Sequence, residues 1–475
     1  MTGEEALSLS IAELGRTYRR REVSPVEATA AALQRIERLD PQLHSFITVT
    51  SDLAMKQAAA AEQELARGMD RGPLHGVPIG LKDLYATKGI RTTAHSKILQ
   101  DWIPDEDATV TTKLYQAGVV LLGKLAMHEF AWGPPPDFDL PFPPARNPWD
   151  LERVPGGSSS GSGVALAARL CFGAMGSDTG GSIRSPAHLC GIVGLKTTYG
   201  LVSRHGVVPL SWSLDSCGPM ARTVEDCAIL LQAIAGRDPA DPASADRPLP
   251  NYRAALGGAI LGRRIGVPRS WIFDGDGPDP DVAAAFETAL SALQDLGAEL
   301  VDVDGRIFVD ARYPQMVIMM SEAYAYHEAN FKARPQDYGP VVRNRLREVA
   351  VTSAADYIQA QRARTVISRE IDAVFAHVDA VVTPMAARPA ERFQDYSPAA
   401  AARITNFSGA FNLYGGPAIC VPCGFSRDGL PIGLQIAGRH FDEPAVLSLA
   451  YAYEQVASCS QQEPPVLRAT HSRGG

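Results

Sequence analysis

Short, largely apolar runs alternate with amphipathic segments along most of the chain. The apolar runs have the length of buried strands and lie at residues 77–81, 119–122, 264–267, 380–382, 419–421 and 432–436. Helical periodicity occurs between them, at residues 107–117, 162–170, 223–235, 279–296, 356–376 and 443–457. This alternation predicts an α/β layer fold with helices on both faces of a central sheet.

Three segments depart from that rhythm. Residues 1–68 are predicted to be a helical segment that packs on the core, with capping boxes at Ser10-Ile-Ala-Glu13 and Ser24-Pro-Val-Glu27. Residues 133–144 contain six prolines and predict a stiff irregular loop. Residues 306–355 read as a mostly helical insertion, which we expect to border the substrate pocket.

Composition narrows the class of protein. Hydrophobic residues make up 45% and charged residues 21% of the 475-residue chain, which is typical of a globular protein. A net charge of −8 argues against nucleic acid or an anionic membrane as a partner. The acidic N-terminus lacks the apolar core of a signal peptide, and no apolar run reaches the ~20 residues of a membrane span.

Cysteine and histidine usage argues against disulfides and metals. An odd count of seven cysteines, spread along the chain, indicates reduced thiols and a cytoplasmic location. Cys420 and Cys423 have CxxC spacing but no second pair, so we interpret them as small apolar residues of a buried strand. The histidines show no ligand spacing. We therefore expect no metal and no cofactor.

One run, Gly156 to Gly163, consists only of glycine and serine. A flexible linker is disfavoured because a good helical pattern follows at once. A phosphate-binding loop is excluded because the required lysine is missing. The segment from Gly157 to Gly161 matches GxSxG with Ser159 as nucleophile, but the preceding stretch holds two prolines and makes a poor strand.

Two further elements carry candidate chemistry. In the stretch Gly176-Ser-Asp-Thr-Gly-Gly-Ser-Ile-Arg184, two glycines allow a tight turn whose N–H groups face an anion next to Ser182. Ser182 alone could merely cap a helix. Lys82 ends an apolar run, where it is either a lysine with its ammonium in solvent or a desolvated base.

Together these elements resemble the amidase signature family, whose members carry a Lys–Ser–Ser triad. The resemblance rests on Gly76-Val-Pro…Lys82-Asp83, Gly156-Gly-Ser-Ser159 and Asp178-Thr-Gly-Gly-Ser-Ile-Arg184, in the family's order and spacing. It is strongest over residues 70–235, the expected signature core with the triad. It implies a single compact domain, residues 1–475, built on a large mixed, mostly parallel sheet.

The resemblance also implies roles for individual residues. Ser182 is the nucleophile, Lys82 the base, and Ser158 the proton bridge between them, following a cis Gly157–Ser158 peptide. The oxyanion is held by backbone N–H groups of Thr179, Gly180, Gly181 and Ser182. Supporting roles around the triad fall to Ser159, which orients the lysine, and to Asp178 and Arg184, which hold the loop.

The expected reaction is cleavage of a carboxamide C–N bond through an acyl-enzyme. The Pro-rich loop, with Phe138 and Phe142, suggests a rigid apolar entrance that admits bulky neutral groups. We therefore expect a neutral small-molecule amide such as an anilide, as in aryl acylamidases, or an aryl carbamate, as in urethanases. Alternatives are a serine esterase, a non-catalytic scaffold, or the glutaminase subunit of a tRNA-dependent amidotransferase. For that last role the resemblance predicts an acid near Thr405, where this chain has threonine. For the oligomeric state, a homodimer is kept as one alternative.

Overall fold

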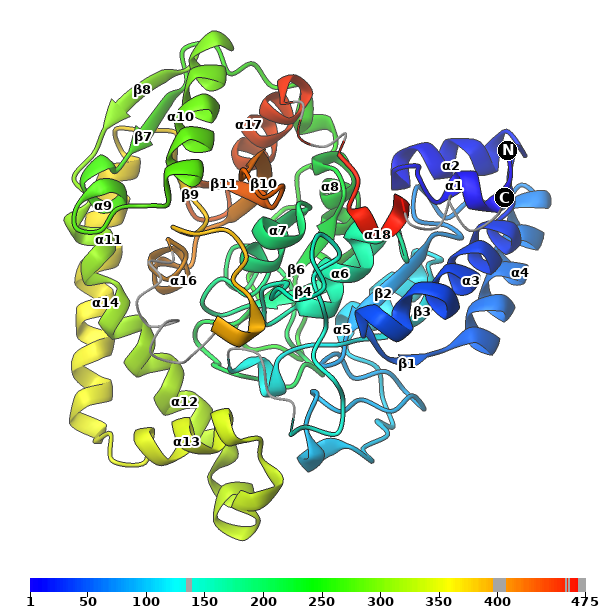
Figure 1. Cartoon of the computed structure of the whole chain (residues 1–475), viewed down its shortest axis with the longest axis horizontal. Helices are drawn as coiled ribbons and strands as arrows, with labels where there is room; N and C mark the ends of the chain where they lie inside the picture. Colours follow the sequence, from blue (N-terminus) through cyan, green and yellow to red (C-terminus); the bar gives the residue numbers. More distant parts are fainter. Residues whose placement is uncertain (134–138, 396–406, 458, 460–461, 469–475) are drawn as a thin grey trace.

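The computed structural model describes residues 1–133, 139–395, 407–457, 459 and 462–468 (Figure 1). Within them, a sheet of eleven strands runs through the molecule in the order β1-β3-β2-β4-β6-β5-β10-β11-β9-β7-β8. The strands are β1 (Phe46–Val49), β2 (Pro78–Lys82), β3 (Val120–Leu125), β4 (Gly173–Asp178), β5 (Val193–Lys196), β6 (Ser216–Ala221), β7 (Arg264–Val267), β8 (Glu299–Asp302), β9 (Ala380–Pro384), β10 (Ala418–Phe425) and β11 (Pro431–Ala437).

Helices surround this sheet, and their order follows the predicted alternation. They are α1 (Gly3–Ala6), α2 (Ile11–Arg19), α3 (Pro25–Leu43), α4 (Ser51–Ala66), α5 (Thr109–Gln116), α6 (Ser160–Ala167), α7 (Arg184–Cys190), α8 (Val224–Ile234), α9 (Arg269–Phe273), α10 (Pro280–Asp295), α11 (Arg306–Asp310), α12 (Arg312–Ala333), α13 (Pro340–Val349), α14 (Ala354–Phe375), α16 (Gly409–Tyr414), α17 (Glu443–Val456) and α18 (Pro465–Arg468). The predicted α/β class is confirmed.

The expectation of a mostly parallel sheet was wrong. Among the described strands, the pairs β2–β3, β2–β4, β7–β8 and β7–β9 are parallel, and the other six pairs are antiparallel. A parallel pair needs a crossover of a dozen or more residues, whereas β10 and β11 are joined by a short turn and must run antiparallel. The sequence patterns also missed β5 and β6, because a glycine in each strand and a proline in β6 hide their strand character.

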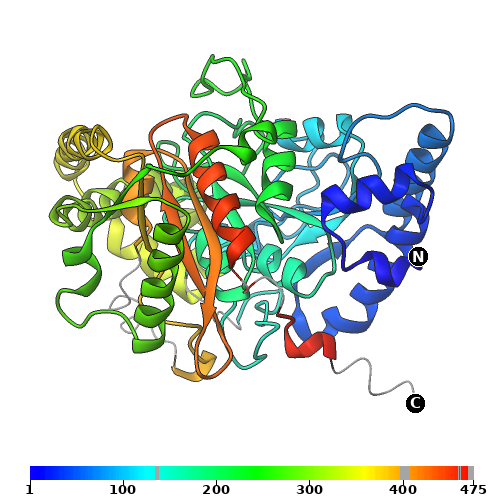
Figure 2. The ribbon, with the colours of Figure 1, turned by 90° about the horizontal axis from the view of Figure 1, so that it is seen from above.

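Strand β4 shows how helices cover both faces of the sheet. A Cβ atom added at Gly173 would meet Leu230 of α8, whereas one at Gly176 would meet Ile183 at the start of α7. Residues an odd number of positions apart on a strand face opposite sides. Helices α6 and α7 therefore lie on one face and α8 on the other (Figure 2).

The N-terminal segment is helical, as predicted, except at one place. Both capping boxes are present, at Ser10 and Ser24, and they start α2 and α3. The predicted helical segment did not include a strand, but residues 46–49 form β1 and pair antiparallel with the end of β3. These four residues, Phe-Ile-Thr-Val, are β-branched or aromatic and complete the sheet edge. Figure 1 shows α1 to α4 gathered beside this edge.

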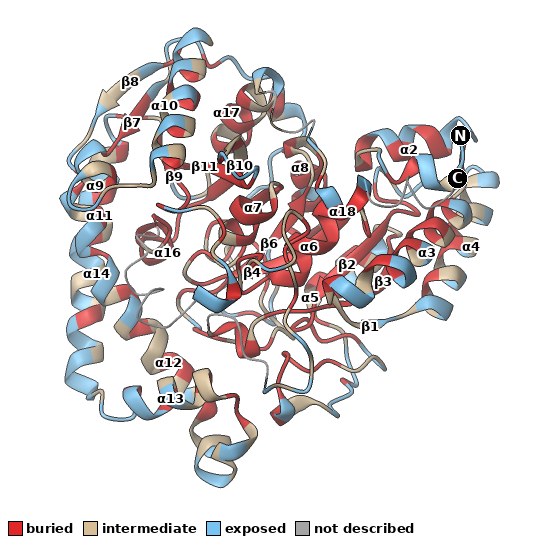
Figure 3. Ribbon diagram, viewed as in Figure 1, coloured by how far each residue is buried: buried red, intermediate tan, exposed pale blue. Residues whose placement is uncertain are grey.

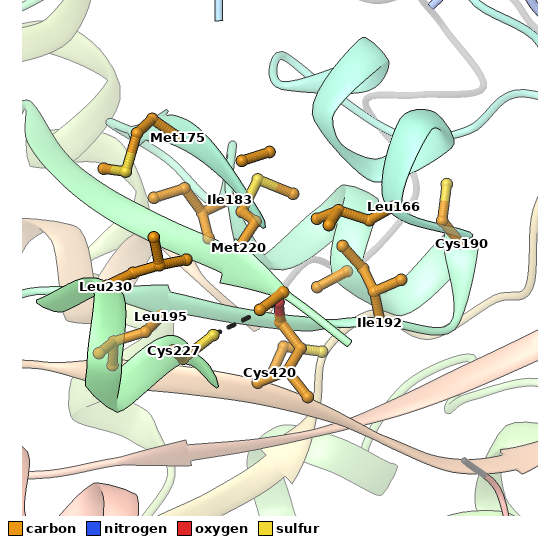
Figure 4. Packing of buried hydrophobic residues seen from close by; sticks show 14 of the residues in the cluster. Leu166, Met175, Ile183, Cys190, Ile192, Leu195, Met220, Cys227, Leu230 and Cys420 are labelled. Atoms are coloured by element: carbon orange, nitrogen blue, oxygen red, sulfur yellow. Dashed lines mark hydrogen bonds between the residues drawn. The ribbon is translucent and has the colours of Figure 1, made fainter. Parts of the chain in front are cut away.

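Burial is deepest around the middle strands, where α6 packs on β2, β4 and β6, and α7 packs on β5, β10 and β11 (Figure 3). Figure 4 shows this core near α7, with Ile183, Leu166 and Met220 packed between the helices and the sheet. The predicted insertion, residues 306–355 with α11, α12 and α13, is more exposed and lies to one side. In the described residues we find no helix that is both long and apolar enough to cross a membrane.

Candidate active site

Lys82 and the Asp178 loop meet because their strands are parallel neighbours. Strands β2 and β4 pair with Leu81 opposite Met175, so their carboxyl ends lie side by side. Lys82 is the last residue of β2, and Ser177 and Asp178 are the last residues of β4. The loop after β4 then turns back to α7. Residues almost a hundred positions apart in sequence are thereby brought to one edge of the sheet.

Lys82 is wholly buried at this edge. Its Nζ atom lies 2.7 Å from Ser158 Oγ and 2.8 Å from Ser177 Oγ. Burial lowers the pKa of Lys82 to about 7, although Asp178 and Asp215 nearby act in the opposite direction. Transfer of an ammonium from water is costly, and neither serine supplies a negative charge to offset that cost. The amine can therefore be neutral, and able to accept a proton, near neutral pH.

The Gly/Ser run places Ser158 directly on this lysine. The Gly157–Ser158 peptide is cis, as the resemblance implied. The Ser158 carbonyl accepts a hydrogen bond from the backbone N–H of His128, and a Cβ atom at Gly157 would collide with the His128 ring. Helix α6 begins at Ser160, so the later serines of the run are helical.

Ser159 does not contact the lysine, which corrects the expectation that it orients Lys82. Its hydroxyl instead lies 3.3 Å from both the backbone N and O of Ser177. The second hydroxyl on Lys82 is that of Ser177, which the sequence patterns did not single out. The sequence feature that could have indicated Ser177 is its position directly before Asp178 in the loop motif.

The expected nucleophile, Ser182, lies next to Ser159 of the Gly/Ser run. It is half-buried, and the backbone N–H of Ser159 donates to its carbonyl at 3.1 Å. Its hydroxyl makes no hydrogen bond to any described residue, so the structure does not join it to Ser158 in this state. Helix α7 begins at Arg184 with Ile183 as its cap, so Ser182 is not a capping residue.

The four expected oxyanion donors are not equivalent. The N–H of Gly181 donates to Asp178 Oδ1 at 2.7 Å, which removes Gly181 from the expected set. The N–H groups of Thr179, Gly180 and Ser182 make no such bond within the described chain. Gly181 has a φ of +117°, and a Cβ atom there would lie 2.5 Å from Ser408 Oγ, so only glycine fits.

Asp178 and Arg184 form a fully buried ion pair that holds the loop. Two guanidinium nitrogens lie 3.0 and 2.9 Å from the carboxylate oxygens of Asp178. The same guanidinium donates to Gln435 Oε1 at 2.5 Å and to Asn412 Oδ1 at 2.6 Å. Burial alone would raise the pKa of Asp178, but the charge and hydrogen bonds of Arg184 hold it well below its usual range. The pair therefore ties the loop to α16 and β11.

Replacing Arg184 by methionine is expected to lower the free energy of unfolding by about 3–5 kcal/mol, because the Asp178 carboxylate then stays buried without its partner. Urea unfolding followed by tryptophan fluorescence measures this change. Arg306→Met removes an exposed Arg–Asp pair and serves as the control, with no change expected in the unfolding midpoint. Equal midpoints for both variants would contradict the proposed support.

Asp215 and Gln315 complete the surroundings of the loop, and the sequence patterns missed both. Asp215 Oδ1 accepts a hydrogen bond from Thr179 Oγ1 at 2.6 Å. Gln315, on α12, donates from Nε2 to the Thr179 carbonyl at 3.0 Å. The pairing of β6 with β4 brings Asp215 to the loop, and the packing of α12 against the loop brings Gln315 there.

The Pro-rich loop is only partly described, and Phe138 lies outside the described residues. Phe142 packs edge-on against His95 and under the Arg91 guanidinium. A small cavity nearby is lined by His128, Trp132, Leu140 and Val341, among others, but Phe142 is not among its described lining residues.

Comparison with known proteins agrees with this geometry. The Amidase family model matches residues 27–447. One chain of the glutamyl-tRNA(Gln) amidotransferase of Geobacter metallireducens is 42% identical, and the match covers 97% of this chain and 99% of that protein.

Two solved structures are similar over nearly their whole length. The peptide amidase from Stenotrophomonas maltophilia has a TM-score of 0.83 at 34% identity, covering 96% of this chain and 98% of that one. A bacterial aryl acylamidase has a TM-score of 0.86 at 26% identity, covering 97% and 98%. With its Lys–Ser–Ser elements, its fold and these matches, the chain belongs to the amidase signature family and is a hydrolase of C–N bonds.

Proposed function

We propose that this protein hydrolyses a carboxamide through an acyl-enzyme on Ser182, with Lys82 as base and Ser158 as proton bridge. The observation that carries the proposal is the buried Lys82 amine at 2.7 Å from Ser158 Oγ. A lysine that loses its proton near pH 7 can act as a base under ordinary conditions. Catalytic hydrogen bonds are often long before substrate binds, so the unmade Ser158–Ser182 bond is compatible with this role.

The proposed steps balance in protons. Neutral Lys82 takes a proton from Ser158, which takes one from Ser182, and the Ser182 oxygen attacks the carbonyl carbon. The resulting oxyanion is held by the free N–H groups of Thr179, Gly180 and Ser182. As the C–N bond breaks, Ser158 gives its proton to the leaving nitrogen and takes one back from the Lys82 ammonium, which becomes neutral again. Water hydrolyses the ester on Ser182 by the same relay in reverse.

For the substrate, the comparisons favour glutamine, the glutaminase alternative, over an aryl amide. The amidotransferase chain is 42% identical to this protein, whereas the aryl acylamidase is 26% identical. Phe142, one of the two phenylalanines of the predicted apolar entrance, packs against His95 and Arg91. Against glutamine stands Thr405, in the place where an acid was expected; it lies outside the described residues. We propose glutamine as the amide donor, with a second protein chain as the partner.

Steady-state rates on three substrates test the choice. Ammonia release from glutamine is expected to have a kcat/KM at least tenfold above hydrolysis of para-nitroacetanilide or an aryl carbamate. The Ser182→Ala protein, purified in parallel, supplies the background rate for each substrate. Faster hydrolysis of the anilide would contradict the glutamine proposal and favour the hypothesis that the substrate is an aryl amide.

A further inference from the structure

Every peptide group around the free N–H donors has its carbonyl fixed by another group. In a trans peptide the C=O and N–H point in opposite directions, so a bond to the carbonyl also aims the N–H. The Asp178 carbonyl accepts from Asn412 Nδ2 at 3.3 Å, which aims the N–H of Thr179. The Gly181 carbonyl accepts from the N–H of Ser185 at 2.7 Å, which aims the N–H of Ser182.

The middle peptide, between Thr179 and Gly180, is held from outside the signature core. Its carbonyl accepts from Nε2 of Gln315 at 3.0 Å. Gln315 is 7% exposed and lies close to the loop, since a Cβ atom at Gly180 would meet its Nε2 at 3.3 Å. The N–H of Gly180 therefore points away from Gln315.

Two turns further along, helix α12 is also held by hydrogen bonds to the loop that precedes β6. Glu322, seven residues after Gln315 on the same buried side of α12, accepts hydrogen bonds from Ser211 Oγ at 2.5 Å and from the N–H and Oγ of Ser213 at 3.0 and 2.7 Å. The preceding backbone N–H groups, of Leu210 and Ser211, donate to Asp215 Oδ2 at 2.9 and 3.0 Å.

These contacts close a ring of hydrogen bonds. From α12 it passes through Glu322 to the loop before β6, then through Asp215 to the Thr179 hydroxyl, and from the Thr179 carbonyl back to α12 through Gln315. The ring grips Thr179 at both its side chain and its carbonyl. A shift of α12 would therefore turn the Thr179–Gly180 peptide.

From this ring we infer that Gln315 is a positioning residue for the oxyanion hole, through which the helical insertion sets the direction of the Gly180 N–H. The inference rests on the proposed role of Ser182 as nucleophile. It assigns to α12 a part in the chemical step, beyond forming a wall beside the substrate. Oxyanion donors act only when preorganised, and loss of one costs roughly 10²–10³ in kcat in other serine hydrolases.

The test compares Gln315→Met, which keeps the length of the side chain and removes its donor, with Gln315→Glu, which replaces the donor by an acceptor. Both are expected to lower kcat about tenfold or more and to leave KM within about twofold, because a misaimed N–H weakens only the charged tetrahedral state. Phenylboronic acid, whose adduct with a serine is tetrahedral and anionic, is expected to lose affinity by a similar factor.

Met316→Ala, an exposed change on the same helix, is the control and should keep wild-type kcat. Thermal unfolding of each variant verifies that the fold is intact. If Gln315→Met keeps kcat and boronate affinity while Ser182→Ala is inactive, the inference is wrong and the proposed function stands. A change in KM alone would make Gln315 a substrate contact and also overturn the inference. If Ser182→Ala retains turnover, both the inference about Gln315 and the proposed function are wrong.

Discussion

The substitution Ser182→Ala is expected to reduce amide turnover by a factor on the order of 10⁴–10⁶, the scale seen when the nucleophile of a serine hydrolase is removed. No other hydroxyl can replace it on the proposed path, because Ser158 already hydrogen-bonds Lys82 and Ser159 bonds to the Ser177 backbone. The half-buried position of Ser182 leaves it open to a substrate carbonyl. Steady-state ammonia or amine release measures the loss.

Ser185→Ala, three residues further along in the first turn of α7, is the matched control and should keep most of the activity, because its backbone N–H is unchanged. Phenylmethylsulfonyl fluoride should add one sulfonyl group to the peptide that contains Ser182, detected by mass spectrometry, and none to Ser182→Ala. If Ser182→Ala stayed active and Ser159→Ala lost activity, the GxSxG elbow would replace the proposed triad.

The substitution Lys82→Met is expected to lower kcat by about 10²–10⁴, the usual contribution of a general base. Methionine fills the buried space without a charge, so the fold is expected to persist. In the wild-type protein, burial lowers the pKa of Lys82 to about 7. The ammonium that dominates below this pH cannot accept a proton. The rate should therefore rise about tenfold per pH unit below pH 7 and level off above it.

A second buried lysine makes a sharp control for this pH profile. Burial also lowers the pKa of Lys196 to about 7, but its Nζ donates to the Thr197 carbonyl at 2.9 Å and contacts neither triad serine. Lys196→Met should keep the rise near pH 7. If the rise vanished in Lys196→Met and persisted in the residual rate of Lys82→Met, Lys82 would not be the base.

Much of the strand and helix order could be predicted from local patterns, because a buried strand needs an apolar run whatever surrounds it. All six apolar runs became strands, and β7 occupies the predicted residues 264–267. The strands β5 and β6 could not be found this way. Each of these short strands contains one glycine, and β6 also contains a proline. They are stable as strands because neighbouring strands supply the hydrogen bonds and α7 packs closely on Gly194.

Strand direction, and with it the mixed character of the sheet, depends on which strands become neighbours, and no local pattern carries that information. The insertion of β6 and β5 between β4 and β10 makes the centre of the sheet antiparallel. The parallel pairing of β2 with β4 is the part that matters for the site, since it brings Lys82 beside Ser177.

By itself the sequence identified the residues with candidate chemistry. Lys82, Ser158 and Ser182 stand in motifs whose order and spacing can be recognised along the chain without a structure. It also separated Ser158 from the three other serines of the Gly/Ser run. Only the tertiary structure decided which N–H groups are free to meet an oxyanion, because the partner of a backbone group is set by what packs against it. That packing removed Gly181 and brought in Ser177, Asp215 and Gln315, contributed by three separate segments of the chain.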